Sequence, residues 1–330
     1  MILVTGGAGY IGSHINKMLN KCGYETIVFD NLVYGHKELV KWGRFIKGDL
    51  ENIEEIEKVF EKYPIEAVFH FAAYAYVGES MINPAKYYRN NVSNTINLLD
   101  AMRKHKCNKI IFSSTCATYG EPDHVPITED MPQKPINPYG KTKLVVENIF
   151  KDYALAYGMK FAVLRYFNAA GADPDCEIGE WHEPETHIIP LVFDAAAGKR
   201  ENIKVYGTDY DTRDGSCVRD YIHVYDLATA HLKALEYLKA GGDSDSFNLG
   251  NSEATTVFEV IDAVKRQTGR KFYVENSDRR PGDPATLVGS AEKAKSVLGW
   301  VPKYSDIDTI VKHAWEWYVK SAKLRTGGDI

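Results

Sequence analysis

The residues with the clearest chemical potential are a tyrosine and a lysine four positions apart, Tyr139 and Lys143. They come just after Asn137-Pro138, a pair typical of a helix start, so both side chains project from one helix face, one turn apart. The lysine ammonium favours the ionised phenol and lowers a tyrosine pKa that is ordinarily about 10. The spacing therefore indicates a tyrosine that acts as a base, although an ordinary aromatic residue at a helix start has the same appearance.

Three consecutive hydroxyl residues, Ser113, Ser114 and Thr115, stand at the end of a predicted strand. A hydroxyl group at this place can bridge a substrate oxygen and the phenol of Tyr139. Ser114 and Thr115 are both candidates, because the sequence does not show which of them faces the substrate. The alternative is that these hydroxyls only satisfy backbone groups of the following loop.

A glycine-rich segment begins the chain, with Gly6, Gly9 and Gly12 directly after the first predicted strand and at the start of a helix. This order allows a tight turn, close approach of the backbone to a pyrophosphate, and a phosphate held at the helix N-terminus, beside Tyr10 and Ile11. Glycines also serve plain turns, so the motif gains its weight from the strand and helix around it.

An acidic residue ends the second predicted strand, 18 residues after Gly12. This residue, Asp30, can accept hydrogen bonds from the ribose hydroxyls of a dinucleotide, and Asn31 follows it. A carboxylate would repel a 2′-phosphate, so NAD is the expected cofactor rather than NADP. A positively charged nicotinamide ring beside Tyr139 would also favour the phenolate. The alternative for Asp30 is a simple turn or cap residue.

The elements that position these residues follow from the alternation of apolar and amphipathic runs in the first half of the chain. This alternation is typical of repeated βαβ units, which form a parallel sheet covered by helices on both faces, with the ligand at the carboxyl ends of the strands. The predicted strands are Ile2–Thr5, Thr26–Asp30, Arg44–Lys47, Ala67–Phe71, Lys109–Ser113 and Lys160–Tyr166. The predicted helices are Tyr10–Lys21, Ile53–Tyr63, Pro84–His105 and Tyr139–Tyr157.

The chain is expected to form two domains of an α/β fold. Residues 1–168 form a doubly wound, parallel-sheet Rossmann domain for NAD, to which residues 220–240 return as a strand and a helix. Residues 169–219 and 241–330 form a smaller, mixed α/β domain for the substrate, because loop residues replace the regular alternation after about Asn168.

Composition excludes several classes of protein. The net charge of −5 and the pI near 6.1 provide no basic field, so no nucleic-acid partner is expected. Five scattered cysteines form neither a CxxC pair nor a Cys/His cluster at zinc spacing, which favours a reducing cytoplasm and no bound metal. The first residues form a predicted strand rather than a signal peptide, and no apolar run is long enough to span a membrane. We therefore expect a soluble cytoplasmic protein.

The glycine spacing, the hydroxyl strand end and the YxxxK pair resemble those of short-chain dehydrogenases. Four later segments are similar to the nucleotide-sugar segments of UDP-glucose 4-epimerases, which belong to the extended branch of that family, and the resemblance spans nearly the whole chain. These segments are Arg165-Tyr166-Phe167-Asn168, His187-Ile188-Ile189-Pro190, Val218 to Val224, and Arg280-Pro281-Gly282-Asp283.

The resemblance implies further contacts with the cofactor. It places Gly48-Asp49-Leu50 near the adenine, Phe71-Ala72-Ala73 along the cofactor, and Asn90, Ser113 and Tyr166 close to it. It places the catalytic hydroxyl at Thr115, with Ser114 as the neighbouring candidate. Ala75 occupies a position where some members carry a lysine near the nicotinamide ribose, so one cofactor contact is absent or comes from elsewhere.

The substrate contacts are inferred from the same segments. Arg219 and Arg280 offer planar guanidinium groups for a diphosphate, and Asn168 can donate an amide N–H to it. The alternative for each arginine is a surface salt bridge to a neighbouring aspartate. The resemblance adds His187 and Asp283 to the substrate site. It also places Leu287 beside the sugar C2 substituent, where leucine is intermediate between residues that exclude N-acetyl sugars and residues that admit them.

The resemblance implies an NAD-dependent 4-epimerase, an isomerase that interconverts UDP-galactose and UDP-glucose. In this reaction Tyr139 removes the 4-hydroxyl proton while hydride passes to NAD, and the resulting 4-keto sugar turns over and recovers the hydride on its other face. Epimerisation of UDP-N-acetylglucosamine, UDP-glucuronate or UDP-xylose stays open, as does a non-catalytic NAD-binding regulator. A 4,6-dehydratase is disfavoured, because Cys116-Ala117 follow Thr115 where such enzymes carry Asp-Glu. Related epimerases dimerise through the helices predicted at Pro84–His105 and Tyr139–Tyr157, so we expect a homodimer.

Overall fold

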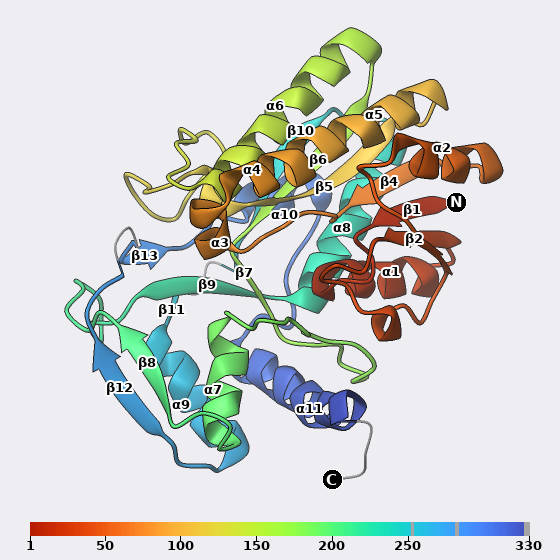
Figure 1. The fold of residues 1–330 in the computed structure, drawn as a ribbon. Helices are drawn as coiled ribbons and strands as arrows, with labels where there is room; N and C mark the ends of the chain where they lie inside the picture. Colours follow the sequence, from red (N-terminus) through yellow and green to blue (C-terminus); the bar gives the residue numbers. More distant parts are fainter. Residues whose placement is uncertain (252–253, 281–283, 327–330) are drawn as a thin grey trace.

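A seven-stranded parallel sheet forms the centre of the larger half of the protein. The computed structural model describes residues 1–251, 254–280 and 284–326, and its main sheet has the order β10-β6-β5-β4-β1-β2-β3 (Figure 1). Every neighbouring pair in this sheet is parallel. Its strands are β1 (Ile2–Thr5), β2 (Thr26–Asp30), β3 (Arg44–Lys47), β4 (Ala67–His70), β5 (Lys109–Thr115), β6 (Lys160–Tyr166) and β10 (Asp245–Leu249).

Helices cover both faces of this sheet, as the strand pattern requires. Ile2 and Val4 of β1 face a layer formed by α1 (Tyr10–Lys21), α8 (Val224–Lys239) and α10 (Glu292–Leu298). Leu3, between them, faces the opposite layer of α2 (Ile53–Lys62), α5 (Asn94–Lys104) and α6 (Pro138–Tyr157). Because side chains alternate along a strand, both faces must be apolar, which explains the fully buried strands of the sequence.

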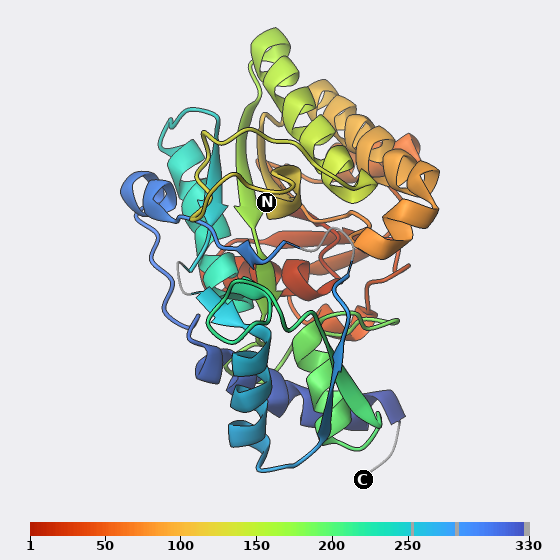
Figure 2. The same ribbon diagram turned by 90° about the vertical axis from the view of Figure 1, so that its left-hand side faces the viewer.

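The smaller half lies at the carboxyl ends of these strands, below the main sheet in Figures 1 and 2. In it β9 (Val218–His223) pairs with β7 (Asn168–Ala170), β11 (Ala254–Thr256) and β13 (Thr286–Leu287), and β8 (Asn202–Tyr206) pairs with β12 (Tyr273–Ser277). A separate apolar core joins α7 (Ile188–Ala196), α9 (Val257–Thr268) and α11 (Ile307–Thr326).

The six predicted strands and the doubly wound α/β architecture are confirmed, with β5 longer by two residues than expected and β4 shorter by one. The predicted helix Pro84–His105 is divided. It consists of α4 (Pro84–Tyr87), a π-helical segment (Tyr88–Ser93) and α5. The π-helical segment contains Asn90 and lies beside the site described below, where such irregular turns are common.

The expected domain boundary needs correction at two places. Residues 241–330 do not all belong to the smaller half, because β10 pairs with β6 and buries Phe247 and Leu249 in the core of the main sheet. Of the returning segment 220–240, helix α8 packs on the main sheet as expected, whereas β9 forms the centre of the second sheet. Apolar burial and strand pairing decide both cases, and neither is visible in a local pattern.

Three short helical segments complete the larger half: α3 (Val77–Ile82), η1 (Lys37–Leu39) and η3 (Cys116–Thr118). Among the described residues, no helix combines the length and the apolar character needed to cross a membrane.

Candidate active site

A cavity of about 420 Å³ opens at the carboxyl ends of β1, β2, β4, β5 and β6. Ligands of open α/β sheets bind at this edge, and the volume is typical of a small-molecule site. The wall includes nearly every residue expected to bind the cofactor: Gly6, Gly9, Tyr10, Ile11, Gly12, Asp30, Asn31, Asp49, Leu50, Phe71, Ala72, Ala73, Asn90, Ser113, Tyr139, Lys143 and Tyr166. The structure therefore brings this predicted set together from the strand ends, the π-helical segment and the start of α6.

Two glycines of the first loop are required by packing within the chain. Gly6 has φ +72°, and a Cβ added there would lie 2.5 Å from the backbone nitrogen of Ala72. A Cβ added at Gly12 would lie 2.4 Å from the carbonyl oxygen of Gly6. These contacts hold the first turn of α1 tightly against β1 and the end of β4.

Gly9 differs, because neither its backbone conformation nor its packing requires glycine. Its φ of −83° and ψ of 175° suit any residue. A Cβ added there would meet only one atom within 4 Å, the Gly6 oxygen at 3.4 Å. Gly9 nevertheless lines the cavity as the N-cap of α1, whose first backbone N–H groups have no carbonyl partners in the helix. This open backbone at a helix N-terminus fits a pyrophosphate.

Asp30 lies at the end of β2, at the place expected for a ribose contact. Its carboxylate accepts the backbone N–H of Ala8 at 3.0 Å and that of Leu32 at 2.8 Å. Burial raises the carboxyl pKa, and the two backbone N–H groups oppose that increase. A carboxylate has more acceptor positions than these two bonds use, so Asp30 retains capacity for ribose hydroxyls.

The start of α6 places the predicted catalytic pair on the cavity wall. The Asn137 side chain accepts the backbone N–H of Gly140 at 2.8 Å and so caps the helix that begins at Pro138. The Tyr139 and Thr115 side chains both line the cavity, and the Lys143 ammonium donates to the Ser113 carbonyl at 2.8 Å. The ammonium nitrogen lies 5.9 Å from the centre of the Tyr139 ring.

The residues around Tyr139 do not by themselves produce the lowered tyrosine pKa that the sequence predicts for Lys143 and the nicotinamide together. Burial raises the pKa of Tyr139 to about 12, although the Thr115 hydroxyl acts in the opposite direction. Burial also lowers the pKa of Lys143 to about 7, so its stabilising charge is weakened at neutral pH. Both shifts have one physical cause, the loss of water around a charged group. Both shifts disfavour the Tyr139 phenolate, and a positive charge beside the ring would favour it.

Ser114 is excluded as a catalytic hydroxyl. Side chains alternate along β5, so Ser113 and Thr115 face the cavity and Ser114 faces away. The Ser114 hydroxyl donates to a carboxylate oxygen of Glu147 at 2.5 Å inside the protein. Ser113 instead forms a hydrogen bond with the Tyr166 hydroxyl, and the Thr115 hydroxyl accepts the Ala117 N–H at 3.1 Å.

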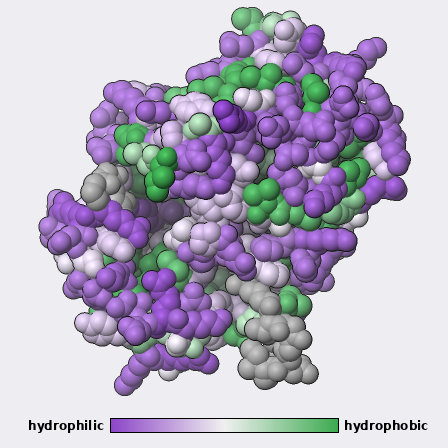
Figure 3. All heavy atoms as spheres, viewed as in Figure 1, coloured by the Kyte–Doolittle hydropathy of each residue, from purple (hydrophilic) through white to green (hydrophobic). Residues whose placement is uncertain are grey.

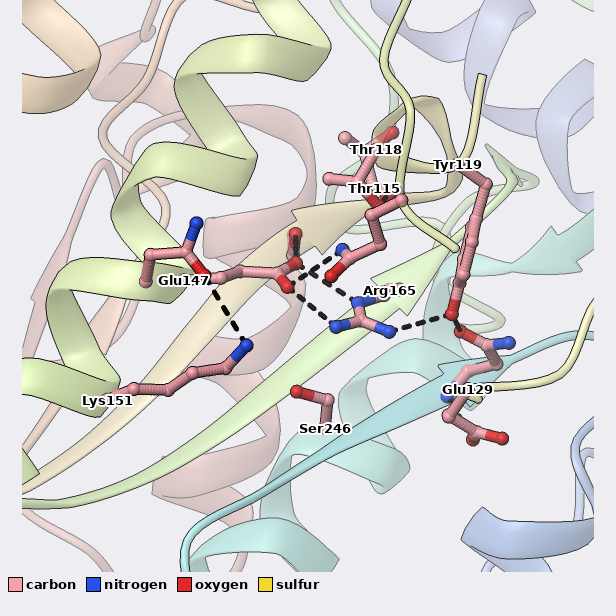
Figure 4. Close-up of polar contacts among 12 residues, drawn as sticks. Thr115, Thr118, Tyr119, Glu129, Glu147, Lys151, Arg165 and Ser246 are labelled. Atoms are coloured by element: carbon pink, nitrogen blue, oxygen red, sulfur yellow. Dashed lines mark hydrogen bonds and ion pairs between the residues drawn. The ribbon is translucent and has the colours of Figure 1, made fainter. Parts of the chain in front are cut away.

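A buried ion pair lies behind the catalytic strand. Two nitrogens of Arg165 contact the two carboxylate oxygens of Glu147 at 3.1 and 2.6 Å, and a third donates to the Tyr119 hydroxyl at 2.7 Å (Figure 4). The Arg165 and Glu147 side chains are 4% and 0% exposed. This network joins α6 to β5 and β6 and fixes the helix that carries Tyr139 and Lys143.

The expected substrate residues are distributed less compactly. Asn168 and His187 line the cavity, and Asn168 also donates to the Asp220 carbonyl at 3.2 Å. Leu287 is half-buried and packs in a small cluster with Phe167 and Cys116, both of which do line the cavity. Asn168 and His187 on the wall, and Leu287 packed behind it, are candidates for contacts with a second ligand.

The two predicted phosphate-binding arginines lie outside the described cavity wall. Arg219 donates to the carbonyls of Val218 and Pro284 at 2.8 and 2.9 Å, and exposed Arg280 stacks on the Tyr206 ring at 3.9 Å. Their expected contact with a diphosphate stays a prediction. Asp283, predicted with them, lies outside the described residues.

Several wall residues were missed by sequence reasoning. They are mainly aromatic and acidic or basic groups from irregular loops: Val33, Tyr34, Gly35, Tyr74, Tyr76, Val77, Asn94, Phe167, Glu180 and His182. Tyr74 and Tyr76 follow β4 in a segment without regular structure, so no periodic signal was available. Ala75 also lines the cavity, and apart from Lys143 the described wall contains no lysine that could make the contact expected at position 75.

The comparisons with known proteins agree with this geometry. Residues 2–250 match the model of the NAD dependent epimerase/dehydratase family. The chain belongs to this family. A UDP-glucose 4-epimerase of Rhizobium meliloti (strain 1021) is 53% identical over 317 residues, which are 96% of each chain.

Two solved structures have the same fold at high sequence identity. The UDP-glucose 4-epimerase from Brucella ovis in complex with NAD is 51% identical with a TM-score of 0.93, over 95% of this chain and 96% of that one. The UDP-Glc/GlcNAc 4-epimerase from Campylobacter jejuni is 43% identical with a TM-score of 0.86, over 97% of this chain and 99% of that one.

As an NAD dependent epimerase/dehydratase, the protein has residues that fit the dinucleotide. The N-terminus of α1 and the bare backbone at Gly9 suit the pyrophosphate, and Asp30 suits the adenosine ribose. Within the family, an elimination would need an acid next to Thr115. Cys116 lies there instead, and burial raises the pKa of its thiol to about 12. The site therefore has no carboxylic acid at position 116, directly after Thr115.

Proposed function

We propose that this protein is an NAD-dependent isomerase that interconverts UDP-galactose and UDP-glucose by inverting C4 of the sugar. The observation that carries the proposal is the placement of Tyr139, Thr115 and Lys143 together on the cavity wall, with the Lys143 ammonium 5.9 Å from the centre of the Tyr139 ring. The Rhizobium meliloti relative at 53% identity bears the name UDP-glucose 4-epimerase.

The chain's own residues supply proton transfer and orientation. Tyr139 accepts the proton of the sugar 4-hydroxyl and returns it after the sugar has turned, and Thr115 holds the same oxygen through its hydroxyl group. Bound NAD supplies hydride acceptance and return at C4, and its positive ring supplies the charge that Tyr139 needs for ionisation. The proton then has an acceptor only while the cofactor is in place, which limits side reactions.

Binding of the nucleotide part is assigned to the part of the cavity wall that contains Asn168 and His187. Asn168 and His187 on the wall present N–H groups suited to a diphosphate, and Arg219 and Arg280 are proposed to approach it when substrate binds. An anchored diphosphate allows the sugar to rotate while the rest of the substrate stays fixed. This rotation is what lets one hydride donor serve both faces of C4.

Activity on UDP-N-acetylglucosamine is a second candidate, favoured by one observation. Leu287 packs beside Phe167 and Cys116 at the sugar end of the cavity and is smaller than a tyrosine. The relative from Campylobacter jejuni is named as a UDP-Glc/GlcNAc 4-epimerase. Absence of conversion at high enzyme concentration would exclude this second activity.

A homodimer and a cytoplasmic location complete the proposal. Exposed apolar side chains on α6, namely Val145, Leu155 and Tyr157, provide a surface for self-association, and α5 runs beside α6 (Figure 1). The free thiols Cys22, Cys107, Cys116, Cys176 and Cys217 suit a reducing compartment. Mass in solution tests the dimer.

The experiment is conversion of UDP-galactose by purified protein with NAD, followed by NMR of both sugars. The same equilibrium ratio reached from UDP-galactose and from UDP-glucose supports the proposal. Tyr139→Phe should abolish turnover while NAD and UDP still bind, whereas the matched variant Tyr157→Phe, at the exposed end of the same helix, should retain it. Turnover by Tyr139→Phe would remove its role, and failure with every UDP-sugar would leave a non-catalytic NAD-binding protein.

A further inference from the structure

A cluster of two histidines and two glutamates lies on the cavity wall, within one short segment of the smaller half. Its members are Glu180, His182, Glu185 and His187, and one ligand atom from each lies within 4.8 Å of all the others. Glu180, His182 and His187 also line the cavity. Sequence reasoning missed the cluster because it searched for cysteine-based zinc spacing.

Close contacts link each histidine of the cluster to both glutamates. Nδ1 of His182 lies 3.2 Å from a Glu180 oxygen and 3.6 Å from a Glu185 oxygen. Nδ1 of His187 lies 2.9 Å from an oxygen of each glutamate. A zinc ion with bonds of about 2.0–2.1 Å in tetrahedral geometry separates its ligand atoms by about 3.3 Å. The histidine–glutamate separations of 2.9 to 3.6 Å bracket that value, and the two Glu185 contacts use different oxygens of its carboxylate.

A second acidic cluster shows the contrasting case. Asp173, Asp175 and Glu177 also gather their carboxylates. Their centre is already filled by the Lys17 ammonium, which lies 2.5, 2.9 and 2.7 Å from the three side chains. That arrangement is a satisfied ion pair network and needs no metal. In the first cluster the positive partners are imidazoles, which are themselves metal ligands when neutral.

We propose that Glu180, His182, Glu185 and His187 bind one divalent transition metal ion, with zinc as the best fit. Two imidazole nitrogens and two carboxylate oxygens suit zinc, whereas calcium takes six to eight oxygen ligands and magnesium requires an octahedral set of oxygens. Because the protein supplies all four ligands, the site is closed and structural rather than catalytic.

The consequence of metal binding is a fixed shape for one wall of the cavity. All four ligands belong to residues 180–187, so the metal holds this segment without joining distant parts of the chain. The His182 ring lies edge-on to Tyr10 at 6.0 Å and to Tyr76 at 6.4 Å, and both tyrosines line the cavity. Fixing the segment therefore fixes the surface that these aromatic rings present.

The test uses the full chain, treated with a chelator and then titrated with Co²⁺ and with Zn²⁺. We expect one Co²⁺ per chain, with the visible absorption of a four-coordinate ion and no sulfur charge-transfer band. Zn²⁺ should displace the Co²⁺ and raise the Tm. The double variant His182→Ala/Glu185→Ala should lose the Co²⁺ spectrum, while Asp175→Asn in the Lys17 cluster and His124→Ala on an exposed loop should keep it.

Three results would overturn the proposal. One is a Kd weaker than about 100 μM for both ions, which is too weak for a closed structural site. Another is an unchanged Co²⁺ spectrum in the double variant. The third is a sulfur charge-transfer band that disappears in Cys22→Ser, since this would assign the metal to the exposed thiol. These readouts need no substrate, so they are independent of the proposed epimerase activity.

Discussion

Replacing Gly9 by alanine should separate cofactor binding from folding. The backbone at Gly9 has φ −83° and ψ 175°, and an added Cβ would meet only the Gly6 oxygen, at 3.4 Å. The methyl group fits the protein without strain but projects where a pyrophosphate must approach the N-terminus of α1. We therefore expect a stable variant that binds NAD poorly.

The magnitudes can be set for each effect. Alanine is a poorer N-cap than glycine by up to about 1 kcal/mol. Loss of backbone freedom in the unfolded chain offsets this by about 0.4–1 kcal/mol. The net change in stability should stay within about 1 kcal/mol. A displaced phosphate loses at least one hydrogen bond to a charged group, about 1.5–3 kcal/mol, so the Kd for NAD should rise at least tenfold.

Two further glycines serve as matched controls. A Cβ at Gly12 would lie 2.4 Å from the Gly6 oxygen and 2.9 Å from the Gly7 Cα, so Gly12→Ala should lower the stability by about 1–3 kcal/mol. A Cβ at Gly78 in α3 meets no atom within 4 Å, so Gly78→Ala should leave NAD binding unchanged.

The assays are calorimetric titration of the cofactor-free protein with NAD and thermal unfolding followed by circular dichroism. Gly9→Ala should show the raised Kd with a Tm within a few degrees of the parent protein. Wild-type affinity in this variant would refute the placement of the pyrophosphate at Gly9. A large fall in Tm would show that packing, rather than ligand approach, explains this glycine.

Two further predictions concern buried charges. Burial lowers the pKa of Lys143 in the folded protein to about 7, while its value in the unfolded chain stays near 10.5. Between these pH values the unfolded chain therefore binds more protons than the folded protein. The free energy of unfolding of the cofactor-free protein should rise with pH across that window. Chemical unfolding should show Lys143→Met to be more stable than the parent protein at pH 7. This difference in the free energy of unfolding should be smaller by about 4 kcal/mol at pH 10. An unchanged difference would contradict the lowered pKa of Lys143. Arg165→Met leaves the Glu147 carboxylate buried without its charged partner, so it should lower the free energy of unfolding in a urea titration by about 3–5 kcal/mol. The double variant Arg165→Met/Glu147→Leu should recover most of this loss. Equal losses in both variants would argue against an ion-pair origin.

The local pattern of the chain was enough to predict the main sheet. Short apolar runs bounded by turns specify the parallel strands, and the bounds of β1, β2, β6 and the partly exposed edge strand β3 were predicted to the residue. The glycine spacing and Asp30 located the cofactor loop, since each depends on near neighbours in the sequence. The YxxxK pair was predictable for the same reason, because both residues stand on one helix.

The tertiary structure decided which hydroxyl faces the site. Ser114 and Thr115 are equivalent in sequence, but a strand turns successive side chains to opposite faces, and only packing shows which face is the cavity. The buried partner of Ser114 is Glu147 on α6, whose carboxylate is also paired with Arg165 on β6. The direction of the Tyr139 pKa shift also depended on burial, which is a property of the whole fold.

The sequence by itself determined most of the elements and the positions of the glycine loop and of the Tyr139–Lys143 pair, because these arise from periodicity and spacing within a few residues of chain. Only the tertiary structure placed β10 beside β6, moved β9 into a second sheet, and brought Glu180, His182, Glu185 and His187 around one point. Strand partners and side-chain clusters depend on contacts between segments far apart in the chain or on the path of an irregular loop. Such contacts are chosen by total apolar burial and charge pairing, which no local pattern contains.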